Sequence, residues 1–466
     1  MVFADLFFIY FFLPLCLIFY FTAKTLDRKN LVLIIFSLVF YAWGKPLYVL
    51  LLLFSAGFNW ALGLALEKFR GTPMSKIVLG AGIAVDLALL LVFKYSGALF
   101  RAQTKAAQAA MPIGIGVFTL QAVSYLVDCF REKVAVQHSF KKFLLYLSLF
   151  PQLLAGPIVR YSAVEQAIDD RRTSVSDACD GALRVIVGLA KKVILANNLY
   201  AIVTAFFGSD ISGLSVLGTW YTAVIFTLYI YFEFSGYADI AIGLGRIFGF
   251  RFDENFNYPF AGRTVTDFCG RWYLSLGAFF RDYVLSLPFF GKNYRYLGLF
   301  LVWLCTGMWF GSGWNFILWG LYLGFFLFFE QTFGKNIVEK WPVWVKHIYS
   351  KLVIVLGFGI FYFRAPGQLV KFFGRVSGLS MLTSRAPFAD SLTWASFTDN
   401  FFLIAAAVIC SLPLLPRIKT FFLKNRNHTV YAIGRYGALA CCAAMLVILS
   451  ILLAGAAGNP LAYFRF

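Results

Sequence analysis

Charged and phenolic side chains interrupt an otherwise apolar sequence in the second half of residues 229–324. Arg271 and Tyr273 come first, and Arg281 and Asp282 follow after a short apolar segment. Ionisable groups at membrane depth are costly, so they mark a functional site by default. A guanidinium group can bind a phosphate, and a phenol can donate a hydrogen bond to a developing oxyanion. The alternative is that Arg271, Arg281 and Asp282 form a purely structural charge cluster.

Two thiols flank the same region and suggest covalent chemistry, because a thiolate is a strong nucleophile. Cys269 and Cys305 have no histidine or clear cationic partner nearby in the sequence, so we expect both to be unreactive. The eight cysteines show no CxxC or Cys/His spacing, and we therefore expect no metal site and no disulfide framework. The only histidines are expected in cytoplasmic loops away from this region: His138, His347 and His428.

The other conspicuous residues of the region are aromatic or amide side chains that we expect to pack between helices. Gly311 and Gly313 lie among them and would permit close helix approach. Upstream, Glu233 and Asp239 follow a membrane span, and we interpret both as groups that pack or cap helices. The packing residues are Trp309, Trp314, Asn315 and Trp319.

The composition of the chain indicates the class of protein in which these side chains lie. Of 466 residues, 61% are hydrophobic, and the mean hydropathy is +0.77. A soluble domain has roughly 45–50% apolar residues, so the chain is predicted to be an all-α, polytopic membrane protein. The formal charge of +19 lies mainly in short loops, which indicates cytoplasmic loops and contact with anionic lipids rather than nucleic acid.

A membrane-spanning helix needs about 20 apolar residues, and the sequence offers about 11 to 14 such segments. We expect one integral membrane domain over residues 1–466, with its core motifs in 229–324. Residues 5–23 have no basic segment before them and are interpreted as a retained first helix. The distribution of Lys and Arg places the N-terminus, and also the C-terminus, outside the plasma membrane.

Three parts of the sequence need a separate interpretation, because they are not simple membrane spans or because two predicted spans lie next to each other. Residues 150–157 contain two prolines and a glycine in a hydrophobic run, which predicts a broken or re-entrant element. Lys191 and Lys192 lie within an apolar segment, and we expect them to extend toward the cytoplasmic surface. Residues 215–232 and 234–250 are predicted as two separate spans.

Several motifs occur together and in a consistent order along the chain. The sequence thereby resembles the membrane-bound O-acyltransferase family, in the branch of the alginate O-acetylation and teichoic acid D-alanyl transfer proteins. The motifs are YAWG at 41–44, FPQLLAGPIVRY at 150–161, YFEFSGYADIAIG at 231–243, ENFNYP at 254–259, FRDY at 280–283 and WFGSGWNFILWG at 309–320.

The resemblance implies a bowl of membrane helices around a thinned centre with a tunnel. It implies that an acyl group arrives from the cytoplasm as a thioester of coenzyme A or of an acyl carrier protein, with no cofactor held permanently. The acyl group would leave toward a hydroxyl on the outer side, often with an extracytoplasmic SGNH-type acyltransferase. Residues expected at the tunnel or its mouth are Arg271, Trp272, Arg281, Asp282, Trp309, Trp314, Asn315 and Trp319.

The family associates two histidines with its chemistry, and neither motif position holds histidine here. Tyr273 occupies the position in the first motif and Phe310 the position in the second. A positioned general base accelerates such a transfer by roughly 10²–10⁴-fold. Tyrosine, with a reference pKa near 10, is a poor base at neutral pH, and phenylalanine is none. We therefore expect both residues to be aromatic fillers of a site that has lost this chemistry.

Three functions follow and stay open at the level of sequence. The chain could be a catalytically degenerate conduit, scaffold or regulatory subunit in surface-polysaccharide O-acylation. It could be an active acyltransferase that uses Tyr273 or a base from a partner. It could also be a lipid or small-molecule transporter with the same fold. The sequence does not specify the acyl group, the acceptor or the oligomeric state.

Overall fold

The computed structural model describes residues 1–43, 45–99, 112, 114–154, 156–208, 210–286, 295–334, 337–383, 386–423 and 428–455. Every regular element within these ranges is a helix, which confirms the predicted all-α class. Backbone contacts divide the chain into two compact units. The first unit comprises Met1–Gly188, Tyr237–Glu254 and the chain from Leu453, and the second comprises Leu189–Gly236 and Asn255–Leu452. The expectation of one integral domain over residues 1–466 stays a prediction.

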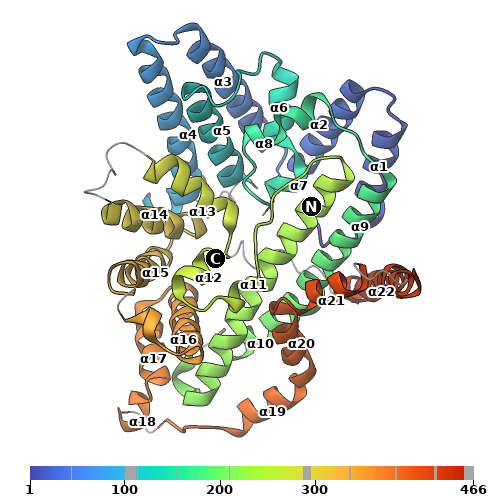
Figure 1. Cartoon of the computed structure of the whole chain (residues 1–466). Helices are drawn as coiled ribbons and strands as arrows, with labels where there is room; N and C mark the ends of the chain where they lie inside the picture. The colour runs from blue at the N-terminus through green and yellow to red at the C-terminus, as the bar shows by residue number, and fades with distance from the viewer. Residues whose placement is uncertain are drawn as a thin grey trace. The chain divides into compact units, whose positions relative to one another are not determined.

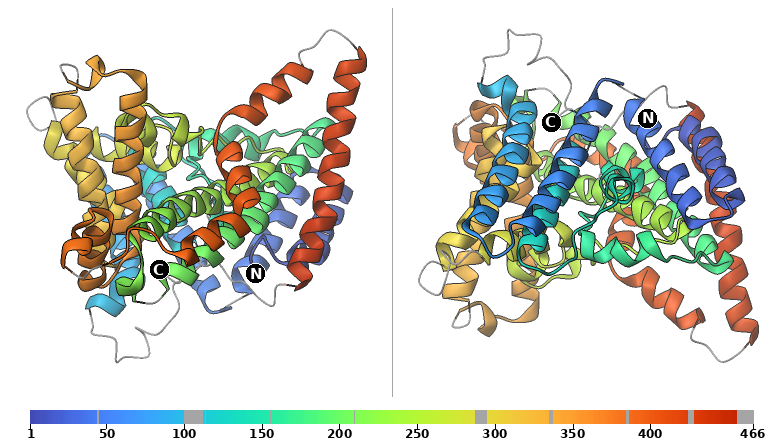
Figure 2. Two further views of the ribbon diagram at one scale, coloured as in Figure 1. Left: turned by 90° about the horizontal axis from the view of Figure 1, so that it is seen from below. Right: turned by 90° about the horizontal axis from the view of Figure 1, so that it is seen from above.

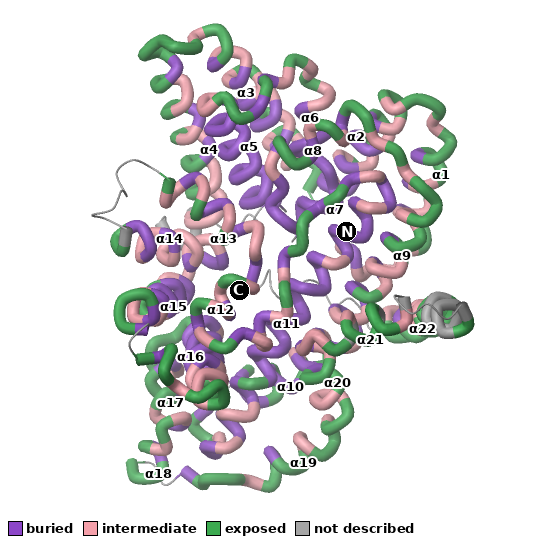
Figure 3. The backbone as a smooth tube through the Cα atoms, in the orientation of Figure 1, coloured by how far each residue is buried: buried purple, intermediate pink, exposed green. Residues whose placement is uncertain are grey.

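The first unit is built on apolar helices of the N-terminal part of the chain (Figure 1). Helices α3, α4 and α5 pack against one another, and nearly all of α5 is buried (Figure 3). Pro14 follows the π-helical turn η1 at the start of α1, within the continuous helix Phe8–Thr22, and the Thr25 hydroxyl caps α2. The elements are η1 (Phe8–Phe12), α1 (Leu13–Thr22), α2 (Leu26–Ala42), α3 (Tyr48–Lys68), α4 (Pro73–Leu99), α5 (Ile115–Phe130), α6 (Phe140–Ser148), α7 (Phe150–Leu153), α8 (Tyr161–Asp169) and α9 (Val175–Ala190).

The proline-containing segment after α6 is broken, as predicted. The chain leaves helix α6 at Leu149, forms the single turn α7, and has no regular structure over residues 156–160. Side chains satisfy the backbone groups that the break releases: Ser37 Oγ accepts from Phe150 N at 3.0 Å, and Gln152 Nε2 donates to Tyr146 O at 2.6 Å. Irregular backbone is tolerated at membrane depth only where protein or water satisfies it in this way.

Helices α9 and α11 (Val216–Ile247) meet closely within the first unit. A Cβ added at Gly181 would lie 2.6 Å from Gly243 O, so only glycine permits this approach. Next to the contact, Arg184 forms an ion pair with Asp239 at 2.8 Å and a second with Glu254. Asp239 therefore joins two helices, in agreement with its structural interpretation.

The second unit contains the core motifs and most of the remaining helices. Helix α14 packs against α15 and α15 against α16, and the three are visible together in yellow and orange in Figure 2. A Cβ at Gly320 would lie 2.2 Å from Trp303 O, which shows how closely the α14 and α15 backbones approach. The elements are η2 (Lys191–Ala196), α10 (Asn197–Phe207), η3 (Ile211–Gly213), η4 (Pro259–Ala261), α12 (Val265–Cys269), α13 (Leu274–Phe280), η5 (Arg281–Leu285), α14 (Arg295–Phe310), α15 (Trp314–Thr332), η8 (Val338–Lys340), α16 (Val343–Tyr362), α17 (Pro366–Val376), α18 (Leu379–Thr383), α19 (Ser391–Asp399), α20 (Phe401–Ser411), α21 (Leu414–Leu423) and α22 (His428–Gly455).

Six helices among the described residues are long and apolar enough to cross a membrane, or seven if the α19–α20 pair, bent by 65°, counts as one span. Three further apolar helices are shorter: Phe8–Thr22, Ile115–Phe130 and Tyr296–Phe310. The protein is thus a multi-pass membrane protein. The sequence-based number is larger partly because it counted short and broken segments. The two spans predicted at 215–232 and 234–250 are wrong as separate elements, since α11 continues through both. The central tunnel stays a prediction.

The interpretation of Lys192, in the middle of an apolar segment, was wrong. Lys192 does not extend to a surface: its side chain is 3% exposed and pairs with Glu233, which is 1% exposed. Nζ lies 2.7 Å and 2.6 Å from the two carboxylate oxygens. The lysine is in the π-helical turn η2 and the glutamate is on α11. A π-helical turn changes which side chains share one face of a helix. In η2 the buried Lys192 ammonium group faces the buried Glu233 carboxylate.

Candidate functional site

Tyr273 and Phe310, the two residues that we expect to replace the histidines of the family motifs, are in direct ring contact in the second unit. Their ring centroids are 6.1 Å apart at an interplanar angle of 85°. Phe234 of α11 contacts both rings edge-on, at 6.0 Å from Tyr273 and 5.6 Å from Phe310. All three side chains are buried. Residues that are far apart in the sequence therefore form one aromatic cluster.

Tyr273 reaches this position through an unusual backbone conformation. It lies in the left-handed region, with φ 45° and ψ 60°, immediately before α13. Such a conformation costs of order 1–3 kcal/mol for a residue with a side chain and persists where the surroundings impose it. Two backbone bonds hold the segment against the ENFNYP motif: Leu274 N donates to Asn255 O at 2.8 Å, and Asn257 N donates to Arg271 O at 3.0 Å. The strained backbone of Tyr273 and the two hydrogen bonds that hold it mark this turn as a candidate functional site.

Asn255 connects the motif to the turn through its side chain. It is fully buried, and its Oδ1 accepts from Ser275 N at 3.1 Å and from Ser275 Oγ at 2.8 Å. Burial raises the pKa of the Tyr273 phenol, and a hydrogen-bonding interaction with the Asn255 side chain lowers it by less. The phenol is therefore protonated at neutral pH. It can donate a hydrogen bond but cannot act as a general base.

The tryptophans predicted to line the site do not all lie in the aromatic cluster. Trp319 contacts Phe310 with centroids 5.3 Å apart. Trp272 contacts Phe358 of α16 at 5.4 Å, and Phe358 in turn contacts Trp319 at 6.0 Å. Trp314 is 39% exposed, and its indole N–H donates to Arg364 O at 2.5 Å. Trp272 and Trp319 therefore belong to the aromatic cluster, and Trp314 lies outside it.

Two other predicted residues have different surroundings. Asn315 is buried, and its Nδ2 donates to Phe361 O at 2.6 Å, which joins the start of α15 to the end of α16. Trp309 is half-buried in the last turn of α14. Asn315 therefore connects two helices. The expectation that Asn315 and Trp309 line a tunnel stays a prediction.

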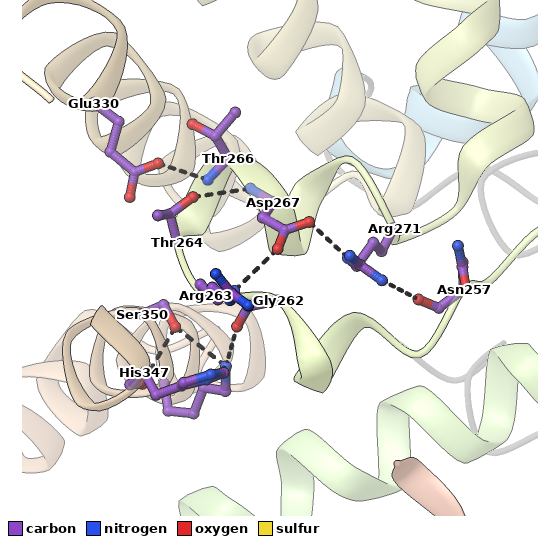
Figure 4. A network of polar contacts seen from close by, with 11 residues as sticks. Asn257, Gly262, Arg263, Thr264, Thr266, Asp267, Arg271, Glu330, His347 and Ser350 are labelled. Atoms are coloured by element: carbon purple, nitrogen blue, oxygen red, sulfur yellow. Dashed lines mark hydrogen bonds and ion pairs between the residues drawn. The ribbon is translucent and has the colours of Figure 1, made fainter. Parts of the chain in front are cut away.

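The three charged residues predicted as one cluster belong to separate ion pairs. Arg271 pairs with Asp267 at 2.6 Å, whereas Arg281 pairs with its neighbour Asp282 at 3.0 Å. Arg271 belongs to the network drawn in Figure 4, in which the short helix α12 is fixed from both sides. The physical reason is local: Asp267 is four residues before Arg271, so the pair joins helix α12 to the turn that follows it.

Helix α12 is held at its N-terminus by a carboxylate from another helix. Glu330 of α15 accepts from Val265 N and Thr266 N, both at 2.8 Å, and the Thr264 hydroxyl accepts from Asp267 N at 3.1 Å. The free N–H groups of a helix start and its positive dipole end favour an anion at this place. Figure 4 shows the contacts of Glu330 with Thr266 and of Thr264 with Asp267, both at the helix that precedes Arg271. The network therefore positions the segment that ends at Tyr273.

The sequence-based placement of His347 in a loop is wrong. It lies in the first turns of α16, and its Nδ1 is 3.2 Å from Lys351 Nζ. Lys351 also donates to Gly262 O, next to Arg263, whose backbone N–H donates to Asp267 at 3.0 Å. His347 is thus linked through the network of Figure 4 to the Asp267–Arg271 pair. His138 is largely exposed, 3.3 Å from Glu67, and the side chain of His428 lies outside the described residues.

Comparison with known proteins agrees with this arrangement of motifs. The family model described as MBOAT, membrane-bound O-acyltransferase family, matches residues 7–364. The chain belongs to the membrane-bound O-acyltransferase family. It is 34% identical over 379 residues to a probable alginate O-acetylase of Pseudomonas aeruginosa, covering 78% of this chain and 72% of that protein. The resemblance identified from the motifs is thereby confirmed.

Two further relatives act on other polymers according to their names. A peptidoglycan O-acetyltransferase of Helicobacter pylori is 28% identical over 474 residues and covers 90% of this chain and 89% of that protein. A teichoic acid D-alanyltransferase of Bacillus subtilis is 28% identical over 245 residues, which is 49% of this chain and 61% of the relative. The similarity therefore extends across several branches of the O-acyltransferase family.

The Cys269 thiol, close in the sequence to Arg271 and Tyr273, is not activated as a nucleophile. Burial raises the pKa of Cys269 well above its ordinary value, and the Glu330 carboxylate adds to the effect. The thiolate is the reactive form, so this environment disfavours nucleophilic chemistry. Among the described residues, no group of three or more His, Cys, Asp and Glu side chains could hold a metal ion.

Residues that sequence analysis did not select are important in this family member. Asn255, Phe234 and Glu330 connect or surround Tyr273, and none was predicted as a site residue. Asn255 lies in the ENFNYP motif and Phe234 in the YFEFSG motif, so membership of a motif was the available signal. Glu330 offered a different signal, because a carboxylate near the end of an apolar helix calls for a partner.

The Asp267–Arg271 pair predicts a pH dependence of stability. Partial burial raises the pKa of Asp267, but hydrogen bonds from Arg271 and the Arg263 backbone outweigh this and hold the pKa below its usual value. The stabilisation is therefore complete above the unfolded-state pKa of about 3.9 and is lost as the pH falls through the lower folded-state pKa. We expect Asp267→Asn to cost about 1 kcal/mol at neutral pH and little at the acid end. Thermal unfolding in detergent from pH 7 to pH 3 measures this.

The matched control for this prediction is Asp27→Asn. Asp27 is an exposed partner of Lys141 at 2.7 Å in the first unit, so its loss should leave the stability curve close to that of the wild type. Equal effects of the two substitutions at every pH would contradict the assignment to Asp267.

Proposed function

We propose that this protein takes part in O-acylation of a cell-surface polysaccharide as a catalytically degenerate family member. The acyl group comes from a cytoplasmic thioester, carried on coenzyme A or an acyl carrier protein, and passes toward a hydroxyl outside the plasma membrane. The protein serves as conduit, scaffold or regulatory subunit, and an extracytoplasmic SGNH-type acyltransferase completes the transfer. The names of the alginate, peptidoglycan and teichoic acid relatives support a polysaccharide acceptor.

The observation that carries the degenerate role is the contact between Tyr273 and Phe310. The two side chains at the positions of the motif histidines face one another in a buried aromatic cluster. Neither can remove a proton from an alcohol at neutral pH, since one is a protonated phenol and the other a benzyl ring. A base near pKa 7 is what hydroxyl acylation needs. The partner would therefore supply it.

Reconstitution in liposomes tests the proposal. We expect the purified protein alone to consume no acyl thioester, and we expect transfer to the polysaccharide when the extracytoplasmic partner is added. Deletion of the gene should lower the O-acyl content of the cell envelope. Wild-type turnover without a partner, abolished by Tyr273→Phe, would contradict degeneracy and favour the active alternative. Transport of a lipid or small molecule without any acylation would favour the transporter.

A further inference from the structure

The contact between helices α3 and α4 in the first unit contains a buried carboxyl group. Asp86 of α4 is 1% exposed, and Asn59 of α3 is fully buried. Asn59 Nδ2 donates to Asp86 Oδ1 at 3.0 Å. Both helices are long and apolar enough to cross a membrane, and the two residues lie near the middle of the spans Tyr48–Lys68 and Pro73–Tyr95. An ionisable group at this depth marks a functional site by default, and its partner must be identified.

The surroundings of Asp86 provide no cation among the described residues. Its Oδ2 is buried and accepts no hydrogen bond from any of them, and the same holds for Asn59 Oδ1. Helix α4 packs against α3 and α5. One turn before Asp86, a Cβ on Gly82 would lie 2.7 Å from the Leu62 side chain and 2.6 Å from that of Leu126, so the neighbouring contacts are close and apolar. The other titratable groups of the three helices, none of which bonds to Asp86, are Tyr48, Glu67, Lys68, Lys76, Lys94, Tyr95, Tyr125, Asp128 and Cys129.

The chemistry of the two groups indicates what satisfies them. An ionised Asp86 would be an unpaired anion in an apolar bundle, which is among the most costly arrangements in a protein. A protonated carboxyl group has an O–H donor, and an amide oxygen is an acceptor. One proton on Asp86 Oδ2 therefore removes the charge and also supplies a donor for Asn59 Oδ1. A proton needs no cavity, whereas a hard metal cation would need several further oxygen ligands.

We propose that Asp86 and Asn59 form a proton-binding site at the centre of the membrane, and that the bound proton controls the contact between α3 and α4. The Asp86 O–H donates to Asn59 Oδ1 while Asn59 Nδ2 donates to Asp86 Oδ1, so two hydrogen bonds join the helices. Loss of the proton to water leaves a carboxylate that faces an amide oxygen, which favours separation of the helices. Helix α4 is suited to this movement, because only 17% of its most apolar segment is buried inside the protein. The site is independent of the acyl-transfer proposal.

Infrared spectroscopy of the full chain in a maltoside detergent, which contains no carbonyl group, tests the proton site. A protonated carboxyl group has a C=O stretching band that a carboxylate lacks. At neutral pH we expect the difference spectrum of the wild type and Asp86→Asn to contain this band, shifted to lower wavenumber in deuterium oxide. Asn59→Leu should move the band to higher wavenumber, because the acid loses its amide partner. Ser55→Ala is the matched control: it removes a hydroxyl that lies 3.4 Å from Asn59 Nδ2 and leaves both proposed bonds in place, so the band should not move.

Hydrogen–deuterium exchange tests the control of the helix contact. As the pH rises and the carboxyl band disappears, we expect the backbone amides of residues 73–95 to exchange faster in the wild type than in Asp86→Asn at the same pH. The asparagine amide replaces the acid with both a donor and an acceptor, so it should keep the contact at every pH.

Asp86→Asn has nearly the shape of the wild type and keeps the test decisive if Asn59→Leu does not fold. Absence of the carboxyl band at neutral pH, an unmoved band in Asn59→Leu, or loss of the band on addition of sodium chloride at constant pH would overturn the proton site. Equal exchange in the wild type and Asp86→Asn at every pH would overturn the control of the contact between α3 and α4.

Discussion

Replacing Lys192 with methionine is expected to destabilise the protein by about 3–5 kcal/mol. The substitution leaves the Glu233 carboxylate, which is 1% exposed, without the ammonium group that contacts both of its oxygens. A buried charge without a partner is among the most costly changes that one substitution can make. Because Glu233 precedes Phe234, which contacts both Tyr273 and Phe310, we also expect the aromatic cluster to lose order. Thermal or denaturant unfolding in detergent measures the effect.

The double variant Lys192→Met/Glu233→Leu separates two contributions to the free energy of unfolding. One is the cost of leaving a single buried charge without a partner, and the other is the net contribution of the ion pair. Removing both charges should recover most of the stability, because apolar groups of similar volume often replace a buried pair at little cost. Lys141→Met, which breaks the exposed pair with Asp27, should cost at most about 1 kcal/mol. If Lys192→Met were no more harmful than Lys141→Met, the buried pair would not be a determinant of stability.

Introducing histidine at both motif positions is expected to raise thioester consumption by about 10²–10⁴-fold. The geometry supports the double substitution Tyr273→His/Phe310→His, since the two rings are already in edge contact. Histidine also tolerates the left-handed backbone of position 273 better than most residues do. An imidazole with a pKa near 6.5 can remove the acceptor proton that a phenol cannot. Single-turnover assays with the purified variant and a hydroxyl acceptor measure the gain.

The two single substitutions and the wild type serve as controls for this experiment. We expect turnover to appear only with both imidazoles, because the rest of the site is unchanged and only the base is new. Phe234→His, which places an imidazole beside the same rings but outside the motif positions, should give little activity. Substantial wild-type turnover, or equal gains in all variants, would show that the absence of histidine at these two positions does not limit the chemistry.

The membrane class, the family and the break after α6 could be predicted from the sequence alone, and the reason is that these properties are local. Apolar composition indicates that the chain lies in a membrane, a proline inside a hydrophobic run interrupts the helical hydrogen bonds, and motifs are read residue by residue. The aromatic character of Tyr273 and Phe310 was equally visible. Their mutual contact was not, because it depends on the path of the chain through α11, α13 and α14.

The tertiary structure decided the partners. Lys192 appeared to need a surface, since sequence shows the cost of burying a charge but not the distant carboxylate on α11 that compensates it. Arg271 appeared close to Asp282 in sequence, yet a partner one helical turn away was available. Asn255 was visible in the sequence only as a member of the ENFNYP motif, and only the fold shows its bonds to Ser275 beside the strained Tyr273. Long-range pairing is a property of the packed chain, so only the packed chain shows which polar groups pair with one another.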